Sequence, residues 1–236
     1  MDKHNHTKLS DDIINKTFVA VFGRPSPLDI DGVLEKIAFD IKLPVAVHDS
    51  TTGEQTWAES INPTRFITQE NSDRREEWMM PKQMISSTDD IFEAWRKINF
   101  TTTERNFNST NTFESDTIYD SANVIRSANC NSCKNILFCD GCAHCEYNIA
   151  SQRSANSSFC IRADDSSNCT NSYNVICSNK ISCSFFIQDC ANLHECMFCS
   201  HIADKRYCIA NMQYTKEEYF EFKTALVEWM ISQLQD

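Results

Sequence analysis

The chain has 236 residues, enough for one sizeable domain or two small ones. Its net charge of −11 argues against nucleic acid as a main partner, because phosphate contacts need clustered Lys and Arg. With 41% hydrophobic residues and no run of about 18 apolar residues, the sequence fits neither a disordered chain nor a membrane-spanning one.

The first twelve residues are polar and lack the apolar core of a signal peptide. We therefore expect the protein inside the cell, or within a particle assembled there. All 13 cysteines lie between Cys130 and Cys208. Their odd number and the lack of a secretion signal weaken the case for a disulfide framework.

Residues 1–105 predict a small α+β region. Residues 17–22 have the composition of a strand, and residues 28–41 carry apolar side chains at helical spacing. We expect this region to cover the start of the segment that follows, or to form a domain of its own.

Two further elements are predicted within the same region. Residues 45–47 and 55–57 flank a polar turn containing Gly53 and predict a hairpin. Residues 87–100 predict a short helix capped by Ser87 or Thr88.

A repeat of twelve residues extends over residues 118–213 without an insertion. Within each block, counted from Ile118, the first, fourth, seventh and tenth places carry small uncharged residues, and we call these the inward positions. Of the 32 inward positions, 29 hold Ser, Cys, Ala, Val, Ile or Leu; the exceptions are Asn148, Lys205 and Asn211. An earlier block, residues 106–117, fits loosely. This pattern indicates the interior of a repeat domain over residues 106–213.

The eighth place of each block supports the same period. It is apolar throughout, and we call this set the eighth-position column: Ile125, Leu137, Ile149, Ile161, Tyr173, Phe185, Met197 and Ile209. Since the seventh and tenth places face inward, the eighth faces outward. The column would then be an apolar strip that something must cover. We expect docking of the chain's own flanks, or of a protein partner or second copy in a larger assembly, with residues from Leu137 to Ile209 as the interface.

Twelve residues are too few for a helix pair and suit one coil of a narrow β-solenoid, so the fold class is mainly β. Coils paired at about 4.8 Å would make a rod roughly 35–40 Å long. Only small side chains fit so narrow a bore, and a buried hydroxyl can bond to carbonyls of adjacent coils. Asparagine tolerates left-handed backbone, which predicts the coil corners: Asn123, Asn129, Asn135, Asn156, Asn168, Asn171, Asn179 and Asn192.

Residues 214–236 predict a C-terminal amphipathic helix. Thr215 and Glu218 have the spacing of a capping box. Apolar residues cover more than half of the helix circumference, so we expect it to be buried on two sides. Its simplest role is to cap the last open coil of the solenoid, with docking onto a partner as the alternative.

The period, with a small residue or cysteine at every third place, resembles that of the beetle antifreeze solenoids. Those proteins bind ice through a flat Thr-x-Thr array, whereas the equivalent pairs here include Asn135/Leu137 and Tyr147/Ile149. The resemblance therefore implies the architecture and not ice binding. The end of the array, residues 207–219, is similar to cysteine-rich repeat proteins of little-studied bacterial lineages. That similarity implies the same fold over about half of the chain and no particular activity.

Metal binding is the main alternative. Three cysteine groups match the ligand spacing of zinc or iron–sulfur sites: Cys130 and Cys133; Cys139, Cys142 and Cys145; Cys196 and Cys199. The same positions elsewhere hold Ser, Ile, Leu or Val, and any inward period of three produces such spacing. Disulfides within one coil, such as Cys133 with Cys139 or Cys190 with Cys196, also remain open.

Catalytic signals are weak. His144, His194 and His201 follow cysteines or lie near them, but they fall on outward places, as does the pair Asp164 and Asp165. No phosphate loop or nucleophile elbow occurs. The sequence therefore predicts a non-enzymatic scaffold without a cofactor, neither nucleic-acid- nor membrane-binding. A subunit of a virion or another large particle is the expected setting, and a cysteine-based zinc or iron–sulfur module is the alternative.

Overall fold

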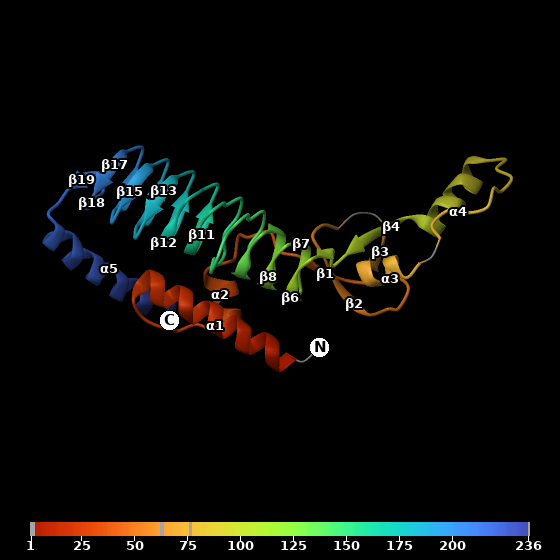
Figure 1. Cartoon of the computed structure of the whole chain (residues 1–236), viewed down its shortest axis with the longest axis horizontal. Helices are drawn as coiled ribbons and strands as arrows, with labels where there is room; N and C mark the ends of the chain where they lie inside the picture. The colour runs from red at the N-terminus through yellow and green to blue at the C-terminus, as the bar shows by residue number, and fades with distance from the viewer. Residues whose placement is uncertain (1–2, 62–63, 76, 236) are drawn as a thin grey trace.

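The computed structural model describes residues 3–61, 64–75 and 77–235. Its main body is a narrow β-solenoid of twelve-residue coils over residues 106–209, with an N-terminal α/β segment and a C-terminal helix (Figure 1). The predicted fold class is therefore confirmed. None of the described helices is long and apolar enough to cross a membrane.

The coils stack in a register of twelve residues. In one row, β6 (Thr110–Phe113), β8 (Ala122–Ile125) and β10 (Lys134–Leu137) pair in parallel, with Thr112 beside Val124 and Val124 beside Ile136. Across the middle coils the same register continues through bridges such as Leu137 with Ile149. The other strands of the solenoid are β5 (Asn106–Phe107), β7 (Asp116–Tyr119), β9 (Ala128–Asn131), β11 (Ser158–Asp164), β12 (Thr170–Ile176), β13 (Asn179–Ser182), β14 (Phe185–Gln188), β15 (Ala191–His194), β16 (Met197–Ser200), β17 (Ala203–Arg206) and β18 (Cys208–Ile209). The loose block at residues 106–117 is thus a true coil.

The backbone turns at every third residue. From Asn108 to Tyr207, every third residue has a φ between 45° and 61°, except Gly141 at 67°. This left-handed conformation costs a residue with a side chain on the order of 1 kcal/mol. Hydrogen bonds to the preceding coil offset that cost, as when the Phe138 N–H donates to the Ile125 carbonyl at 3.1 Å.

Asparagine occupies many of these corners, as expected. Seven of the eight predicted positions have a positive φ, and Asn179 does not. Asn179 begins β13 and pairs in extended conformation with Ala191. Phe138, Arg153 and Cys177 are also left-handed, so the register of twelve imposes the conformation even on residues that disfavour it.

The N-terminal helix overturns one prediction. Residues 17–22, expected as a strand, end the helix α1 (Lys3–Phe22). Their β-branched and aromatic composition favours a strand. However, Ile14, Phe18 and Phe22 lie four residues apart, as on one helix face, and are buried together. Packing of this face against the solenoid outweighs the local preference.

The second predicted helix is shorter than its apolar pattern suggested. It is α2 (Ile30–Lys36), within residues 28–41. The helix begins at Asp29, whose carboxylate accepts the Gly32 N–H at 2.9 Å. Val33 packs into the same apolar cluster as α1.

A small β unit closes the first coil. The predicted hairpin is present as β1 (Val45–His48) and β2 (Gln55–Ala58). Strands β3 (Arg65–Thr68) and β4 (Phe100–Thr103) pair in parallel, and α3 (Gln69–Asp73) follows β3.

Polar contacts join this unit to the rod. The Arg105 guanidinium bonds to both carboxylate oxygens of Asp116 at 3.0 and 2.9 Å. A second carboxylate, Glu59, lies 3.6 Å from the same guanidinium. The unit therefore lies beyond the end of the rod and does not wrap around it (Figure 1).

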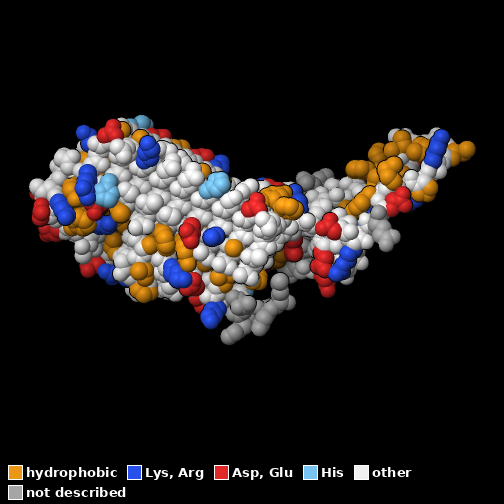
Figure 2. Space-filling view, in the orientation of Figure 1, with side chains coloured by type: hydrophobic (Ala, Val, Ile, Leu, Met, Phe, Trp, Pro, Cys, Tyr) orange, Lys and Arg blue, Asp and Glu red, His pale blue; other side chains and the backbone are white. Residues whose placement is uncertain are grey.

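The helix α4 (Thr88–Ile98) projects away from the rest of the molecule (Figure 1). Ser87 caps it, as predicted, and forms a capping box with Asp90. No residue of α4 is buried. Apolar side chains are exposed over this projecting part of the chain (Figure 2).

The C-terminal helix α5 (Lys216–Gln235) differs from its prediction in two ways. The capping box is confirmed, since the Thr215 N–H donates to Glu218 Oε2 at 2.9 Å and the Glu218 N–H donates to Thr215 Oγ1 at 3.3 Å. However, α5 lies along the side of the rod and not across its end (Figure 1). It is also buried on one side only, because Phe222 and Trp229 remain 51% and 57% exposed. The last coil ends instead in an antiparallel pair formed by β18 and β19 (Met212–Gln213).

We predict that burial of the eighth-position column against the helices stabilises the fold. Ile161→Ala should lower the free energy of unfolding by about 2–5 kcal/mol, because Ile161 is fully buried beneath α1. The half-buried Ile176 of β12 is the control, and Ile176→Ala should cost about 1 kcal/mol. Urea unfolding followed by circular dichroism measures both. Equal losses would show that the helices contribute no special burial at this column.

Candidate functional site

The inward positions form a bore filled by their own side chains. Val124, Ser127 and Cys133 are among the residues fully buried there. The inward prediction fails only in the last block, where Lys205 and Asn211 are exposed. The solenoid ends at that point, so these two places no longer have a bore to face.

Inward serines carry hydrogen bonds from coil to coil. The Ser127 hydroxyl donates to the Ile125 carbonyl at 2.8 Å and accepts the Cys139 N–H at 3.0 Å. Cys139 lies twelve residues later, in the next coil. Ten serines accept the backbone N–H of the residue twelve places later in this way, and we call this set of bonds the serine relay: Ser109, Ser115, Ser121, Ser127, Ser151, Ser157, Ser166, Ser172, Ser178 and Ser184. The serine thus gives the inward N–H of the next coil an acceptor.

This acceptor role was missed from the sequence, which suggested only that serine is small and would bond to carbonyls of adjacent coils. Carbonyls of the next coil do accept from Ser154 and Ser166, at 2.7 and 3.2 Å. The more general partner is the carbonyl two residues earlier in the same coil. The sequence signal that could have indicated these coil-to-coil hydrogen bonds is the recurrence of serine at inward positions, each twelve places before another inward residue.

Asn148 is an exception in composition but not in chemistry. It is fully buried, and its Oδ1 accepts the Cys160 N–H at 3.2 Å, as a serine oxygen would. Its Nδ2 has no hydrogen-bond partner within the described part of the chain. Asn148 therefore belongs to the bore and supplies the acceptor that its place requires.

The cysteines proposed as metal ligands also line the bore. All seven are buried. Their thiols contact carbonyl oxygens, as Cys139 Sγ does with Leu137 O at 3.4 Å and Asn148 O at 3.5 Å. The candidates are Cys130, Cys133, Cys139, Cys142, Cys145, Cys196 and Cys199. A thiol in this arrangement acts as a weak hydrogen-bond donor to the buried carbonyl oxygens of the bore.

Five of these thiols meet in two adjacent coils. Cys133 is hydrogen-bonded to Cys130 and Cys145, and Cys142 is hydrogen-bonded to Cys139 and Cys145. These hydrogen bonds, together with burial, raise the pKa of Cys133 and Cys142. The same bonds lower the pKa of Cys145 below the ordinary value of a thiol, to about 3.

At other places in the bore, burial is the largest cause of a raised thiol pKa, whereas hydrogen bonding to Cys196 lowers the pKa of Cys199 to about 7. Cys160 is held well above its ordinary value, and the pKa of Cys169 is raised to about 11. Such thiols stay protonated at neutral pH, whereas a metal ligand or nucleophile must be a thiolate.

The metal alternative finds no arranged donor set. Within residues 3–61, 64–75 and 77–235, no three His, Cys, Asp or Glu side chains are placed to hold a metal ion. The cysteines there are all free thiols, including the pairs Cys133 with Cys139 and Cys190 with Cys196. The bore thus holds many sulfur atoms without gathering them into a ligand shell.

The proposed interface, the eighth-position column, lies beneath the chain's own helices. Leu137, Ile149, Ile161, Phe185 and Met197 are buried in one cluster with residues of α1, α2 and α5. Of the other residues of the column, Ile125 is buried in the same cluster, and Tyr173 and Ile209 are partly buried against it. The apolar strip that was predicted to need a cover is therefore covered by helices of the same chain.

Aromatic and basic side chains fix the helices on this strip. The Phe22 ring of α1 packs on Tyr173 and Phe185, with ring centroids 5.6 and 6.0 Å apart. From α5, the Lys223 ammonium lies 5.2 Å above the Phe185 ring, and burial lowers the pKa of Lys223. Both helices thus meet on one residue of the column.

Polar contacts at the rim fix the register of the helices along the rod. The Arg162 guanidinium donates to both Asp40 carboxylate oxygens at 2.7 and 2.6 Å, and to the Ile37 carbonyl at 2.6 Å. Hydrogen bonding to Arg162 lowers the pKa of Asp40. The Thr17 hydroxyl also reaches the Tyr147 carbonyl at 3.2 Å.

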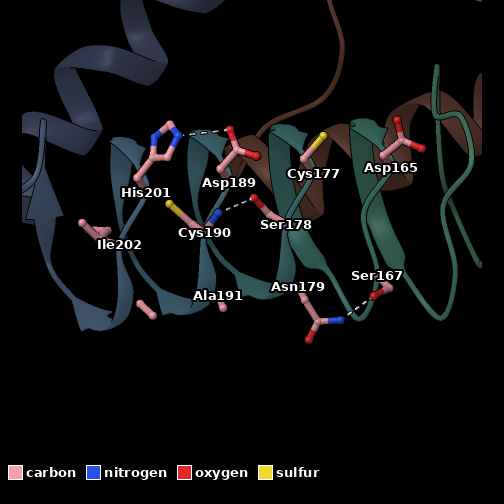
Figure 3. Close-up of a pocket in the computed structure, with 11 residues that line it drawn as sticks. Asp165, Ser167, Cys177, Ser178, Asn179, Asp189, Cys190, Ala191, His201 and Ile202 are labelled. Atoms are coloured by element: carbon pink, nitrogen blue, oxygen red, sulfur yellow. Dashed lines mark hydrogen bonds and ion pairs between the residues drawn. The ribbon is translucent and has the colours of Figure 1, made fainter.

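A shallow groove on another side of the rod carries the most exposed thiol. Asp165, Cys177, Asp189 and His201 form a row, one from each successive coil (Figure 3). His201 Nε2 lies 3.7 Å from Asp189 Oδ2, so the imidazole pairs with a carboxylate and not with the thiol. Burial raises the pKa of Cys177, and the nearby Asp189 and Asp165 raise it further. The row thus lacks the Cys–His pairing of an activated nucleophile.

The other predicted outward residues lie where expected. His144 is exposed and His194 half-buried, with His194 Nδ1 at 2.8 Å from Ser182 Oγ. Asp164 and Asp165 both contact the Arg153 guanidinium at 2.6 Å. His194 and the two aspartates are therefore paired within the surface of the rod.

Comparison of the chain with family models, with curated proteins and with solved structures gives no match. Function is therefore inferred from the bore, the eighth-position column and the exposed surfaces.

We predict that the serine hydroxyl matters more than its volume. Ser127→Ala should cost about 1–3 kcal/mol, because it leaves the Cys139 N–H buried without its acceptor. Ser127→Cys should cost less, since Cys133 Sγ already accepts an N–H from Cys145 at 3.5 Å. Ser132→Ala, at a serine on the outer side, should stay within about 0.5 kcal/mol. Urea midpoints compare the three, and an equal effect of the two Ser127 variants would refute the relay.

A second prediction concerns thiol reactivity. A disulfide reagent should modify the exposed Cys177 first and the half-buried Cys183 more slowly, and all 13 thiols after denaturation. Cys177→Ser should remove the fast phase, and the purified protein should hold no stoichiometric zinc or iron. A native protein with four or more fast thiols, or with bound metal that protects them, contradicts the closed bore.

The same reaction tests the charge around Cys177. Its rate follows the thiolate fraction, so it should rise as pH increases towards the raised pKa of this thiol. Asp189→Asn removes one cause of that raised pKa and should speed the reaction at pH 8. Asp204→Asn, a neutralisation on a different side of the rod, is the control and should leave the rate unchanged.

Proposed function

We propose that this protein is a non-enzymatic structural scaffold, a rigid spacer within a larger assembly inside the cell. A virion or another particle assembled there is the setting we propose to test. The observation that carries the proposal is the closed bore, in which ten serines relay hydrogen bonds between coils and the thiols face carbonyls. The inward serines, and thiols such as that of Cys139, thus hold one coil on the next.

Rigidity is supported by the outer columns as well. Asn123 Nδ2 donates to Asn135 Oδ1 at 2.8 Å, and Asn111 Nδ2 donates to Asn123 Oδ1 at 2.9 Å. The rings of Tyr147 and Phe159 stack at 4.8 Å with an interplanar angle of 6°. Identical contacts repeated at the coil spacing resist bending, because each coil is joined to the next on several sides.

The proposal assigns partner contacts to the surfaces that remain exposed. The eighth-position column already packs against α1, α2 and α5, so a partner would have to displace those helices to reach it. The net charge of −11 supports protein partners over nucleic acid. A scaffold that serves as a spacer needs stability and regular dimensions more than a reactive centre.

The proposal predicts that the chain travels with a large particle in its native source. After gentle lysis, the protein should sediment far ahead of a free 27.1 kDa chain. A serine triple variant, with Cys133→Ser, Cys142→Ser and Cys145→Ser, should remain in the particle. These exchanges keep small acceptors in the bore while removing sulfur. The matched set with Val at the same places should destabilise the rod and release the protein.

Two outcomes would overturn the proposal. Sedimentation as a free monomer under gentle conditions would remove the assembly. Loss of incorporation in a folded serine triple variant would show that sulfur chemistry, such as metal binding, is the function. Circular dichroism of each variant separates loss of incorporation from loss of fold.

A further inference from the structure

The projecting helix α4 presents an apolar face that the described chain does not cover. Ile91, Phe92 and Trp95 are 50%, 54% and 52% exposed. On an α-helix these three residues lie on one side, since their spacing is one and four. They form the apolar part of what we call the α4 face.

The opposite side of α4 borders the segment that precedes the helix. A groove there is lined by Asp90, Glu93, Ala94 and Lys97 of the helix and, from the preceding segment, by Met80, Ile85 and residues between them. Asp90 also accepts the N–H groups of Ser86 and Ser87 in the cap. The chain thus lines a groove on one side of the helix and leaves the α4 face uncovered by the described residues.

The base of the projection is held by stacked cations and rings. The Arg65 guanidinium lies 4.1 Å from the centre of the Phe100 ring, and the Arg75 guanidinium lies 4.2 Å from that of Trp78. Trp78 in turn meets Phe100 edge-on at 6.0 Å. The helix is therefore presented by an ordered base at the end of the rod.

Charge at the edge of the α4 face identifies a partner. Asp89 and Arg96 are seven residues apart, so they lie along the same edge, one near each end of the helix. No hydrogen bond or ion pair joins their side chains to another described residue. If two such helices lie antiparallel about a twofold axis, Asp89 of each faces Arg96 of the other. The same arrangement sets Trp95 against Ile91 and opposes the helix dipoles.

We propose that α4 is the contact between two copies of this chain, packed antiparallel through the α4 face, so that two rods join end to end. The partner is a second copy because the face is complementary to itself in charge. This inference does not depend on which assembly the rod serves. One helix of eleven residues buries less than the roughly 1,200–2,000 Å² of a stable interface, so association is expected at micromolar concentrations and not nanomolar ones.

Analytical ultracentrifugation of the full chain at about 1–200 µM tests the proposal. The wild-type mass should rise with concentration towards twice 27.1 kDa. Trp95→Glu should weaken self-association about tenfold or more, because it places a charge in the centre of the contact. Trp229→Glu, at a similarly exposed tryptophan on α5, is the matched control and should associate like the wild type. Since no residue of α4 is buried, these variants should fold.

Charge reversal tests the antiparallel geometry. Asp89→Arg alone and Arg96→Asp alone should each associate about tenfold more weakly than the wild type, because each sets like charges against one another twice. An equal mixture of these two variants should associate again. In the mixed pair, the arginine introduced into one chain faces the aspartate introduced into the other, and the unchanged Arg96 of the first chain faces the unchanged Asp89 of the second. A structural defect in either variant would not be repaired by mixing.

Three results would overturn the proposal. They are a wild-type chain that stays monomeric throughout, an association that Trp229→Glu weakens and Trp95→Glu does not, and charge-reversed variants that fail to associate when mixed. A monomeric wild type that binds phosphatidylcholine vesicles through Trp95 would assign the α4 face to a lipid surface instead.

Discussion

The N–H group of each inward residue is the constraint on which this structure depends. Of every three residues in a coil, two face outward, and their N–H groups donate to carbonyls of the coils before and after. The N–H group of the third, inward residue points towards the bore. A buried donor without a partner costs about 1–3 kcal/mol, and the bore is too narrow for large polar groups. Serine meets both demands, because its hydroxyl accepts from the next coil and donates to its own. Cysteine at 133 and asparagine at 148 fill the same role with weaker or larger groups.

This constraint explains the composition of the repeat better than size alone. Ile136 and Val124 show that aliphatic side chains fit the bore, yet serine and cysteine outnumber them. Thiols are tolerated because they pack like a small apolar group and contact carbonyls. The high cysteine content thus follows from a geometric requirement, and it needs no metal or disulfide to account for it.

The repeat could be predicted from the sequence because it is expressed in composition at fixed intervals. The register of twelve, the small inward residues and most asparagine corners follow from spacing alone. The helical conformation of residues 17–22 could not be predicted from their strand-like composition. It depends on packing against the eighth-position column, which is distant in sequence. The place of α5 was missed for a similar reason. Its sequence shows an apolar face but not whether that face meets the side of the rod or its end.

The eighth-position column and the α4 face show how the same physical property leads to different outcomes. Both are apolar and both are outward in their local element. The column is covered because α1, α2 and α5 of the same chain reach it, and the contacts of Thr17 and Arg162 fix the N-terminal segment there. Nothing in the local sequence of Ile161 or Trp95 distinguishes the two cases. The difference appears only once the fold places the flanking segments.

The length of α1 sets a further property of the rod. Its 20 residues span about 30 Å, which matches roughly six coils at about 4.8 Å each. His6, near one end, packs on Phe113, and Phe22, at the other, packs on Phe185, six coils later. The helix is therefore a molecular ruler for the solenoid. A duplicated or deleted coil would keep the bore intact but would leave α1 one coil too short or too long for the solenoid. The number of coils and the length of α1 must therefore change together.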